Sequence, residues 1–173
     1  ESDSLKPHLF FLGVFLVLCP AFVYFYSIHI YTTNTPFSDD YVTHLSSFNH
    51  LFSGTIEILE FLSLKYNLHI ITNGFKEIQQ AKLNQSNIDH YFLTVTNSEM
   101  VGVKKPNPKI FHYALKAANA TIKNSLMIGD NLEADIKGAL NIGMDAICFN
   151  YHKEVLSSNI IGIDQLVELK NYI

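Results

Sequence analysis

The chain has 173 residues, enough for one domain with a substantial core, and a formal net charge of −4. The absence of a basic run argues against a nucleic-acid-binding protein, and the absence of an acidic tail argues against a long disordered segment. Cys19 and Cys148 lie far apart in the sequence, which fits neither a metal nor a redox motif and agrees with a reducing, cytoplasmic compartment.

The N-terminal region is unusually apolar. Residues 7–38 contain no Asp, Glu, Lys or Arg, and Leu9–Ile28 is almost wholly apolar. This run is long enough to cross a bilayer, which takes roughly 20 apolar residues. Three interpretations stay open: a membrane anchor, a sequence foreign to the rest of the domain such as the product of a shifted reading frame, or a buried helical hairpin broken at Pro20.

A regular pattern of elements begins after residue 50. Apolar residues at helical spacing predict a helix from Gly54 to about Lys65, and the β-branched run Leu68–Thr72 predicts a buried strand. Asn73-Gly74 alone favours a hairpin, but the apolar residues after it follow helical spacing. The sequence therefore predicts a strand, a turn and a helix.

The same unit repeats toward the C-terminus. Further strands are predicted at 91–96, 125–129 and 146–149, and further helices at 107–118, 132–140 and 163–169. Asn107 and Pro108 are typical of a helix start, and Gly143 of a helix end. Alternating strands and helices predict an α/β fold, a Rossmann-like parallel sheet with helices on both faces. Ligands bind beyond the carboxyl ends of the strands in such sheets.

Two groups of polar residues at predicted strand ends or helix starts suit a phosphate. Thr72, Asn73 and Gly74 offer a hydroxyl, an amide and a flexible backbone before a helix N-terminus. Lys105 is held by the following Pro106 just before a helix and could neutralise a phosphoryl oxygen. The plainer alternatives are a helix cap with a permissive turn for the first group and a solvated surface lysine for the second.

A third group contains two carboxylates. Asp130 ends a predicted buried strand, and Asp135 lies in the first turn of the next helix. Two carboxylates at one edge repel each other unless a cation lies near them, and hard oxygen ligands beside a phosphate suit Mg²⁺. The alternative is that Asp130 caps the helix and Asp135 complements its dipole. We favour the metal-binding interpretation.

These motifs, in this order and separation, resemble those of the haloacid dehalogenase superfamily of hydrolases. Residues 71–74 are similar to the second motif of that superfamily, Lys105-Pro106 to the third, and residues 129–135 to the fourth. The stretches 69–75 and 103–111 resemble most closely the branch of pyrimidine-nucleotide 5′-nucleotidases. The resemblance implies a Mg²⁺-dependent phosphomonoester hydrolase acting on a small phosphorylated substrate, a nucleoside monophosphate.

The resemblance also implies a role for each site residue. Thr72 would hydrogen-bond the transferring phosphoryl group with support from Asn73 and Gly74, and Lys105 would neutralise the phosphorylated enzyme. Asp130 would bind Mg²⁺, and Asp135 would support the metal or Lys105. In this superfamily an aspartate attacks the phosphorus, and a second aspartate two residues later acts as acid and base.

The chain departs from the family at this first motif. It contains no Asp-x-Asp sequence, which should end an apolar strand before residue 50 and precede a helical cap. We therefore divide the chain into residues 1–50, a cap remnant or apolar segment, and residues 51–173, the C-terminal part of the core. We expect the strand that bears the nucleophile to be missing from the sheet, and the chain to be a truncated, inactive enzyme. The alternative is a non-catalytic binding protein of the same fold, anchored to a membrane through residues 9–28.

Overall fold

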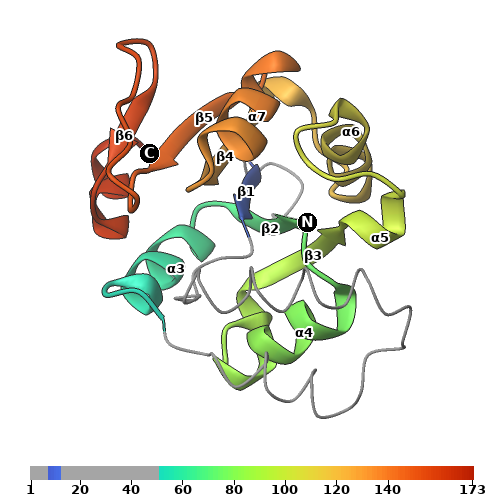
Figure 1. The fold of residues 1–173 in the computed structure, drawn as a ribbon. Coiled ribbons are helices and arrows are strands. Elements are labelled where there is room, and N and C mark those ends of the chain that lie inside the picture. The colour runs from blue at the N-terminus through green and yellow to red at the C-terminus, as the bar shows by residue number, and fades with distance from the viewer. Residues whose placement is uncertain (1–7, 13–50) are drawn as a thin grey trace, which may run out of the picture.

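A computed structural model of the chain describes residues 8–12 and 51–173. The described residues form one six-stranded parallel sheet in the order β3-β2-β1-β4-β5-β6 (Figure 1). The strands are β1 (His8–Leu12), β2 (Asn67–Thr72), β3 (Phe92–Asn97), β4 (Ser125–Gly129), β5 (Asp145–Phe149) and β6 (Ile161–Ile163). This is the predicted α/β, Rossmann-like fold.

Helices cover both faces of the sheet. The α-helices are α3 (Thr55–Ser63), α4 (Lys76–Gln85), α5 (Ser98–Val101), α6 (Pro108–Ala117) and α7 (Gly138–Asn141). Three 3₁₀ turns and one π-helical turn complete the described part: η2 (Asp89–Tyr91), η3 (Ile122–Asn124), η5 (Leu166–Asn171) and the π-helical η4 (Leu132–Lys137). The predicted start of α6 is confirmed, because the Asn107 side chain accepts a hydrogen bond from the Lys109 backbone and Pro108 is the first helical residue.

Two apolar cores lie on opposite faces of the sheet. On one face, Ile58, Leu59 and Leu62 of α3 pack with the sheet and with η5 and are fully buried. On the other face, Phe111 of α6 packs with Phe10 of β1, and both are fully buried. Burying such side chains stabilises the fold by roughly 1.5–3 kcal/mol each, so β1 contributes directly to the second core.

The centre of the sheet corrects our expectation of a missing strand. β1 lies between β2 and β4 and pairs with both in parallel, with Leu12 opposite Ile71 and Phe11 opposite Ile128. The sheet therefore has its central strand. His8–Leu12 also belongs to the core rather than to a cap remnant. The rest of the predicted boundary at residue 50 falls on residues that the structure does not describe.

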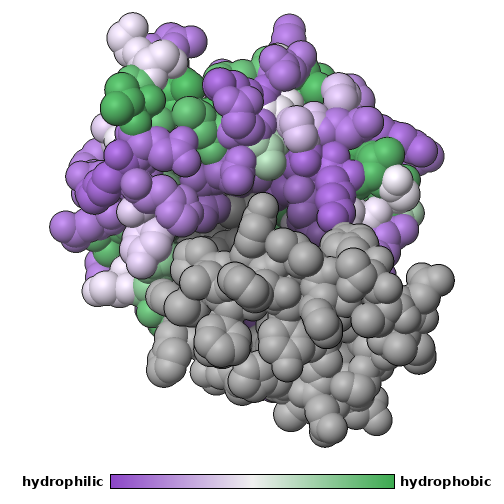
Figure 2. Space-filling model, viewed as in Figure 1, coloured by the Kyte–Doolittle hydropathy of each residue, from purple (hydrophilic) through white to green (hydrophobic). Residues whose placement is uncertain are grey.

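The apolar segment that was one candidate for a membrane anchor begins inside β1. A helix over Leu9–Ile28 is excluded at its first residues, because Leu9–Leu12 are part of a strand. Within residues 8–12 and 51–173, no helix has the length and apolarity to span a bilayer. Figure 2 shows that the described surface on one face is mostly hydrophilic, with apolar residues in small groups. Pro20 lies outside the described residues.

Two expected helices differ from the structure. Residues 163–169 were expected to form one helix, but Ile161–Ile163 pairs with β5 as the edge strand β6, and a 3₁₀ turn follows it. The expected helix at 132–140 begins instead as a π turn, in which Ile136 donates to the Asn131 carbonyl at 3.3 Å. This turn carries Asp135, so the irregularity lies at the candidate site.

Candidate active site at the carboxyl edge of the sheet

The strand order places the predicted site residues at one edge. The chain passes from β1 outward to β3 and then returns to β4 on the other side of β1, and such a reversal of direction creates a crevice at the carboxyl ends of the strands. Thr72 ends β2, Gly129 ends β4, and Leu12 ends β1 between them. Lys105 and Asp135 come from the segments that follow β3 and β4.

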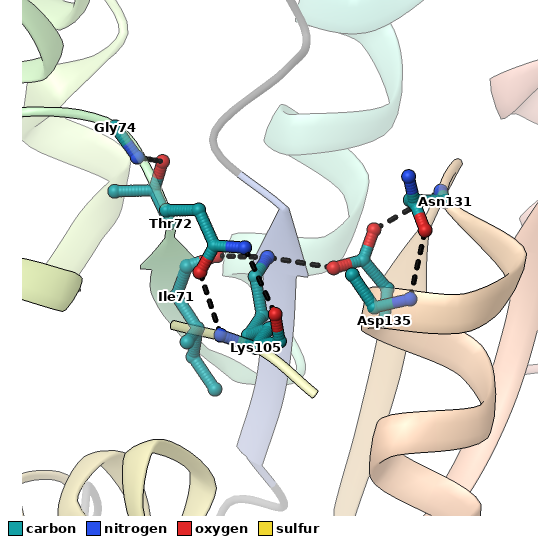
Figure 3. A network of polar contacts seen from close by, with 8 residues as sticks. Ile71, Thr72, Gly74, Lys105, Asn131 and Asp135 are labelled. Carbon is teal, nitrogen blue, oxygen red and sulfur yellow. Dashed lines mark hydrogen bonds and ion pairs between the residues drawn. The ribbon is translucent and has the colours of Figure 1, made fainter. Parts of the chain in front are cut away.

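Lys105 is the centre of the site (Figure 3). Its ammonium Nζ donates a hydrogen bond to the Ile71 carbonyl at 2.7 Å and forms an ion pair with Asp135 Oδ1 at 2.6 Å. The Lys105 side chain is 1% exposed and that of Asp135 is fully buried. Burial lowers the pKa of Lys105, and the charge of Asp135 opposes this shift. The predicted phosphate-binding lysine is therefore buried and linked to β2 and η4.

Asn73 holds the main chain of Lys105. Its Oδ1 accepts a hydrogen bond from the Lys105 backbone N–H at 2.7 Å, and its Nδ2 donates to the Lys105 carbonyl at 3.1 Å. Both contacts cross from the turn after β2 to the segment before α6. A two-way contact of this kind requires an amide, because a carboxylate has no donor. We expected Asn73 to support the phosphate site, and it does contact another predicted site residue.

Thr72 and Gly74 form the turn that opens toward α4. The Thr72 hydroxyl oxygen accepts a hydrogen bond from the Gly74 backbone N–H at 3.0 Å. The oxygen acts as the acceptor here, so this contact does not use the O–H of Thr72 as a donor. Ser98 donates its hydroxyl to the Asn73 carbonyl at 3.2 Å and ties the same turn to α5. The turn is thus held in place by contacts that, within residues 8–12 and 51–173, do not use the Thr72 O–H as a donor.

The π turn η4 and the close packing against Gly129 orient the Asp135 side chain toward Lys105. Its Oδ2 accepts a hydrogen bond from the Asn131 backbone N–H at 3.0 Å. Apart from the ion pair with Lys105, its Oδ1 has no hydrogen-bond partner within the described part of the chain. A Cβ atom at Gly129 would lie 2.6 Å from the Asp135 Cβ, so only glycine permits this approach.

Asp130 has a neighbour that the sequence analysis missed. His152 Nε2, in the segment after β5, lies 3.4 Å from Asp130 Oδ2. Burial and the charge of Asp135 raise the pKa of Asp130. Ligands bind beyond the carboxyl ends of strands, and this expectation also covers the segment after β5. A lone histidine, however, forms no recognisable motif in the sequence.

The residues that could hold a divalent cation are few. Asp130 fits one oxygen ligand for Mg²⁺, because its side chain is 17% exposed at the sheet edge. Both oxygens of Asp135 are already engaged, by Lys105 and by Asn131. Across residues 8–12 and 51–173, no three His, Cys, Asp or Glu side chains gather as a metal-binding group. The metal-binding role of Asp135 stays a prediction.

The family model of haloacid dehalogenase-like hydrolases matches residues 22–149 of the chain. The chain belongs to the haloacid dehalogenase-like hydrolase family. The match begins after β1, so the central strand lies outside the part of the sequence that the family model recognises.

Curated relatives match a little over half of the chain. The chain is 45% identical over 96 residues to a glyceraldehyde 3-phosphate phosphatase of Pyrococcus abyssi, covering 56% of this chain and 40% of the relative. It is 41% identical over 100 residues to the pyrimidine 5′-nucleotidase YjjG of Escherichia coli, covering 57% and 44%. The chain thus spans less than half the length of these relatives.

Solved structures share the fold. A haloacid dehalogenase-type phosphatase from Thermococcus onnurineus superposes with a TM-score of 0.74 at 27% identity, over 85% of this chain and 69% of that one. The hydrolase YfnB of Bacillus subtilis, in a crystal form bound to magnesium, superposes with a TM-score of 0.78 at 20% identity, over 96% and 98% of the two chains. The second likeness concerns the fold alone.

Proposed function

We propose that this site recognises the phosphoryl group of a small phosphomonoester, a nucleoside monophosphate, as in a Mg²⁺-dependent phosphomonoester hydrolase. The observation that carries the proposal is the buried Lys105 ammonium, which lies between the Ile71 carbonyl and Asp135 beside the end of β2. A buried cation at a sheet edge with a hydroxyl nearby is suited to a phosphoryl group. The 41% identity to a pyrimidine 5′-nucleotidase supports the substrate class.

In this proposal each of the predicted site residues has a distinct role in binding the phosphoryl group or the metal. The ammonium of Lys105 has three N–H groups, of which the described contacts use two, so the third can donate to a phosphoryl oxygen. Thr72 donates its O–H to a second oxygen, and Asn73 keeps Lys105 in place. Asp130 would hold Mg²⁺, which supplies positive charge against the phosphoryl oxygens when bound.

The same chain lacks the group that would attack phosphorus. No Asp-x-Asp occurs in its 173 residues. We therefore expect binding without turnover from the chain as given, and hydrolysis only in a protein that supplies the first motif. A second candidate function, phosphate binding with no catalysis in any form of the protein, rests on this same absence.

Calorimetry with the 173-residue chain tests the proposal. Uridine monophosphate should bind, whereas uridine should bind at least about tenfold more weakly, because loss of a single charged contact costs roughly 1.4 kcal/mol or more. Thr72→Val, which removes only the hydroxyl, should weaken binding of the nucleotide and leave that of uridine unchanged. Equal binding of nucleotide and nucleoside would contradict phosphoryl recognition. Tighter binding of glyceraldehyde 3-phosphate would move the substrate class to that of the Pyrococcus abyssi relative.

A further inference from the structure

The segment that follows β5 forms an aromatic surface at the carboxyl edge of the sheet. The centroid of the Tyr151 ring lies 4.7 Å from that of Phe52, with the ring planes at 65°, and 6.1 Å from that of Phe149. Phe149 ends β5 and is buried, and Phe52 is half-buried, whereas Tyr151 is 48% exposed. The two phenylalanines therefore support a tyrosine ring whose remaining surface is open.

A hydrogen-bonded turn holds the backbone on either side of this tyrosine. Asn150 Oδ1 accepts a hydrogen bond from the Glu154 backbone N–H at 2.8 Å, and Asn150 Nδ2 donates to the Glu154 carbonyl at 3.0 Å. The Asn150 backbone N–H also donates to the Ile163 carbonyl of β6 at 2.8 Å. Tyr151 lies inside this turn. A ring held in this way loses little conformational freedom when a ligand binds to it.

His152 links Tyr151 to the predicted phosphate site. The centroids of these two rings are 5.4 Å apart, and His152 Nε2 lies 3.4 Å from Asp130 Oδ2. Asp130 follows β4, the strand between β1 and β5. Burial lowers the pKa of Lys105, and the charges of Asp135 and Asp130 oppose this shift, so Asp130 and the Lys105 ammonium interact. A single side chain, that of His152, thus connects the tyrosine to a carboxylate of the site.

An open aromatic ring beside a phosphate site suits the base of a nucleotide. A ribose separates the base of a nucleoside monophosphate from its phosphoryl group, so the base must lie next to the phosphate site and not within it. A tyrosine ring can stack on any flat base by dispersion and offset ring contact. Ligand sites commonly combine aromatic side chains with a few polar groups, and the polar group beside this ring is the half-exposed His152.

We propose that Tyr151 is the base-stacking residue of this site, and that its ring contacts the pyrimidine of a nucleoside monophosphate whose phosphoryl group lies at Lys105. The inference rests on the proposed function and deepens it, because it assigns selection for the base to one residue of the segment after β5. A phosphorylated ligand that has no base should therefore bind independently of Tyr151.

Calorimetry on the full chain, with Mg²⁺ in every titration, tests this with uridine monophosphate, ribose 5-phosphate and inorganic phosphate. The wild type should bind uridine monophosphate about tenfold or more tightly than ribose 5-phosphate, which has no base. Tyr151→Leu should abolish this difference and change the affinities for ribose 5-phosphate and inorganic phosphate by less than about twofold. Tyr151→Phe, which keeps the ring, should bind uridine monophosphate as the wild type does. Tyr113→Leu, the same replacement at a tyrosine of α6 that is 40% exposed, is the matched control and should also leave this affinity unchanged.

The outcomes separate the inference from the proposed function. A preference for uridine monophosphate that persists in Tyr151→Leu would overturn the role of Tyr151 and leave nucleotides as the substrate class. Equal wild-type affinities for uridine monophosphate and ribose 5-phosphate would overturn base stacking and leave phosphoryl recognition standing. Failure of all three ligands to bind the wild type would instead refute the proposed function. Inorganic phosphate binding shows whether the site of Tyr151→Leu is intact, and the wild-type comparison of the two esters needs no variant.

Discussion

At the residue scale, the Lys105–Asp135 pair is the contact on which the site depends. Both side chains are out of water, and Asp135 Oδ1 has no other partner within the described chain. Removing one member of a buried ion pair leaves the other charge unpaired, which is costlier than removing both. The sequence identified both residues and their closeness to the phosphate site, but their direct pairing was one of two alternatives, because a second carboxylate can support either a metal or a lysine.

A double-mutant cycle measures this dependence. Lys105→Met should lower the free energy of unfolding by about 3–5 kcal/mol. The loss in the double variant Lys105→Met/Asp135→Asn should be about 1–3 kcal/mol smaller than the sum of the losses in the two single variants. The Asp135→Asn substitution keeps an oxygen that can accept the hydrogen bond from the Asn131 backbone N–H. Urea unfolding gives each value. The exposed pair Lys170–Glu57, also at 2.6 Å, is the control, and Lys170→Met should cost less than about 1 kcal/mol. Strictly additive losses at Lys105 and Asp135 would show that the pair is not coupled.

At the scale of elements, strands that are bounded by polar residues were predictable and strands inside a longer apolar run were not. β2 and β4 each combine a β-branched or apolar run with a polar residue at its end, and both were predicted within one residue. β1 was missed because the apolar run resumes directly after Gly13, so no polar residue marks the end of a strand at Leu12. β6 has only three residues, too few for a period to be visible.

The close approach of β4 and η4 gives a prediction at this scale. Gly129→Ala would place a methyl group 2.6 Å from the Asp135 Cβ, so η4 must shift and take Asp135 away from Lys105. Overpacking of this kind costs about 1–3 kcal/mol, and phosphate binding should weaken in parallel. Gly102→Ala is the control, since its Cβ meets nothing within 4 Å and its cost comes only from the positive φ of 77°. Denaturant unfolding and phosphate calorimetry of both variants check this, and unchanged phosphate affinity in Gly129→Ala would contradict it.

At the scale of the whole molecule, a chain of buried polar groups joins three strands at the opposite, amino end of the sheet. His69 Nε2 lies 2.9 Å from His8 Nδ1, and His69 Nδ1 lies 2.8 Å from the Thr94 hydroxyl. The His69 ring also stacks on Phe10, with centroids 5.0 Å apart. Both rings are buried, so β1 is linked to β2 by histidines whose protonation in the folded protein is costly.

This network predicts that the stability of the domain falls in mild acid. Burial, and then the neighbouring His8, lower the pKa of His69 from 6.5 to about 4. Between these two values the unfolded chain binds a proton that the folded chain does not, so the contribution is complete above pH 6.5 and is lost as the pH falls toward 4. One pKa unit corresponds to about 1.4 kcal/mol, so the loss is on the order of 3–4 kcal/mol. Urea unfolding across this range should show a flatter pH dependence for His69→Gln than for the wild type. Equal slopes for His69→Gln and the wild type would mean that the strand-linking histidines do not govern the acid response.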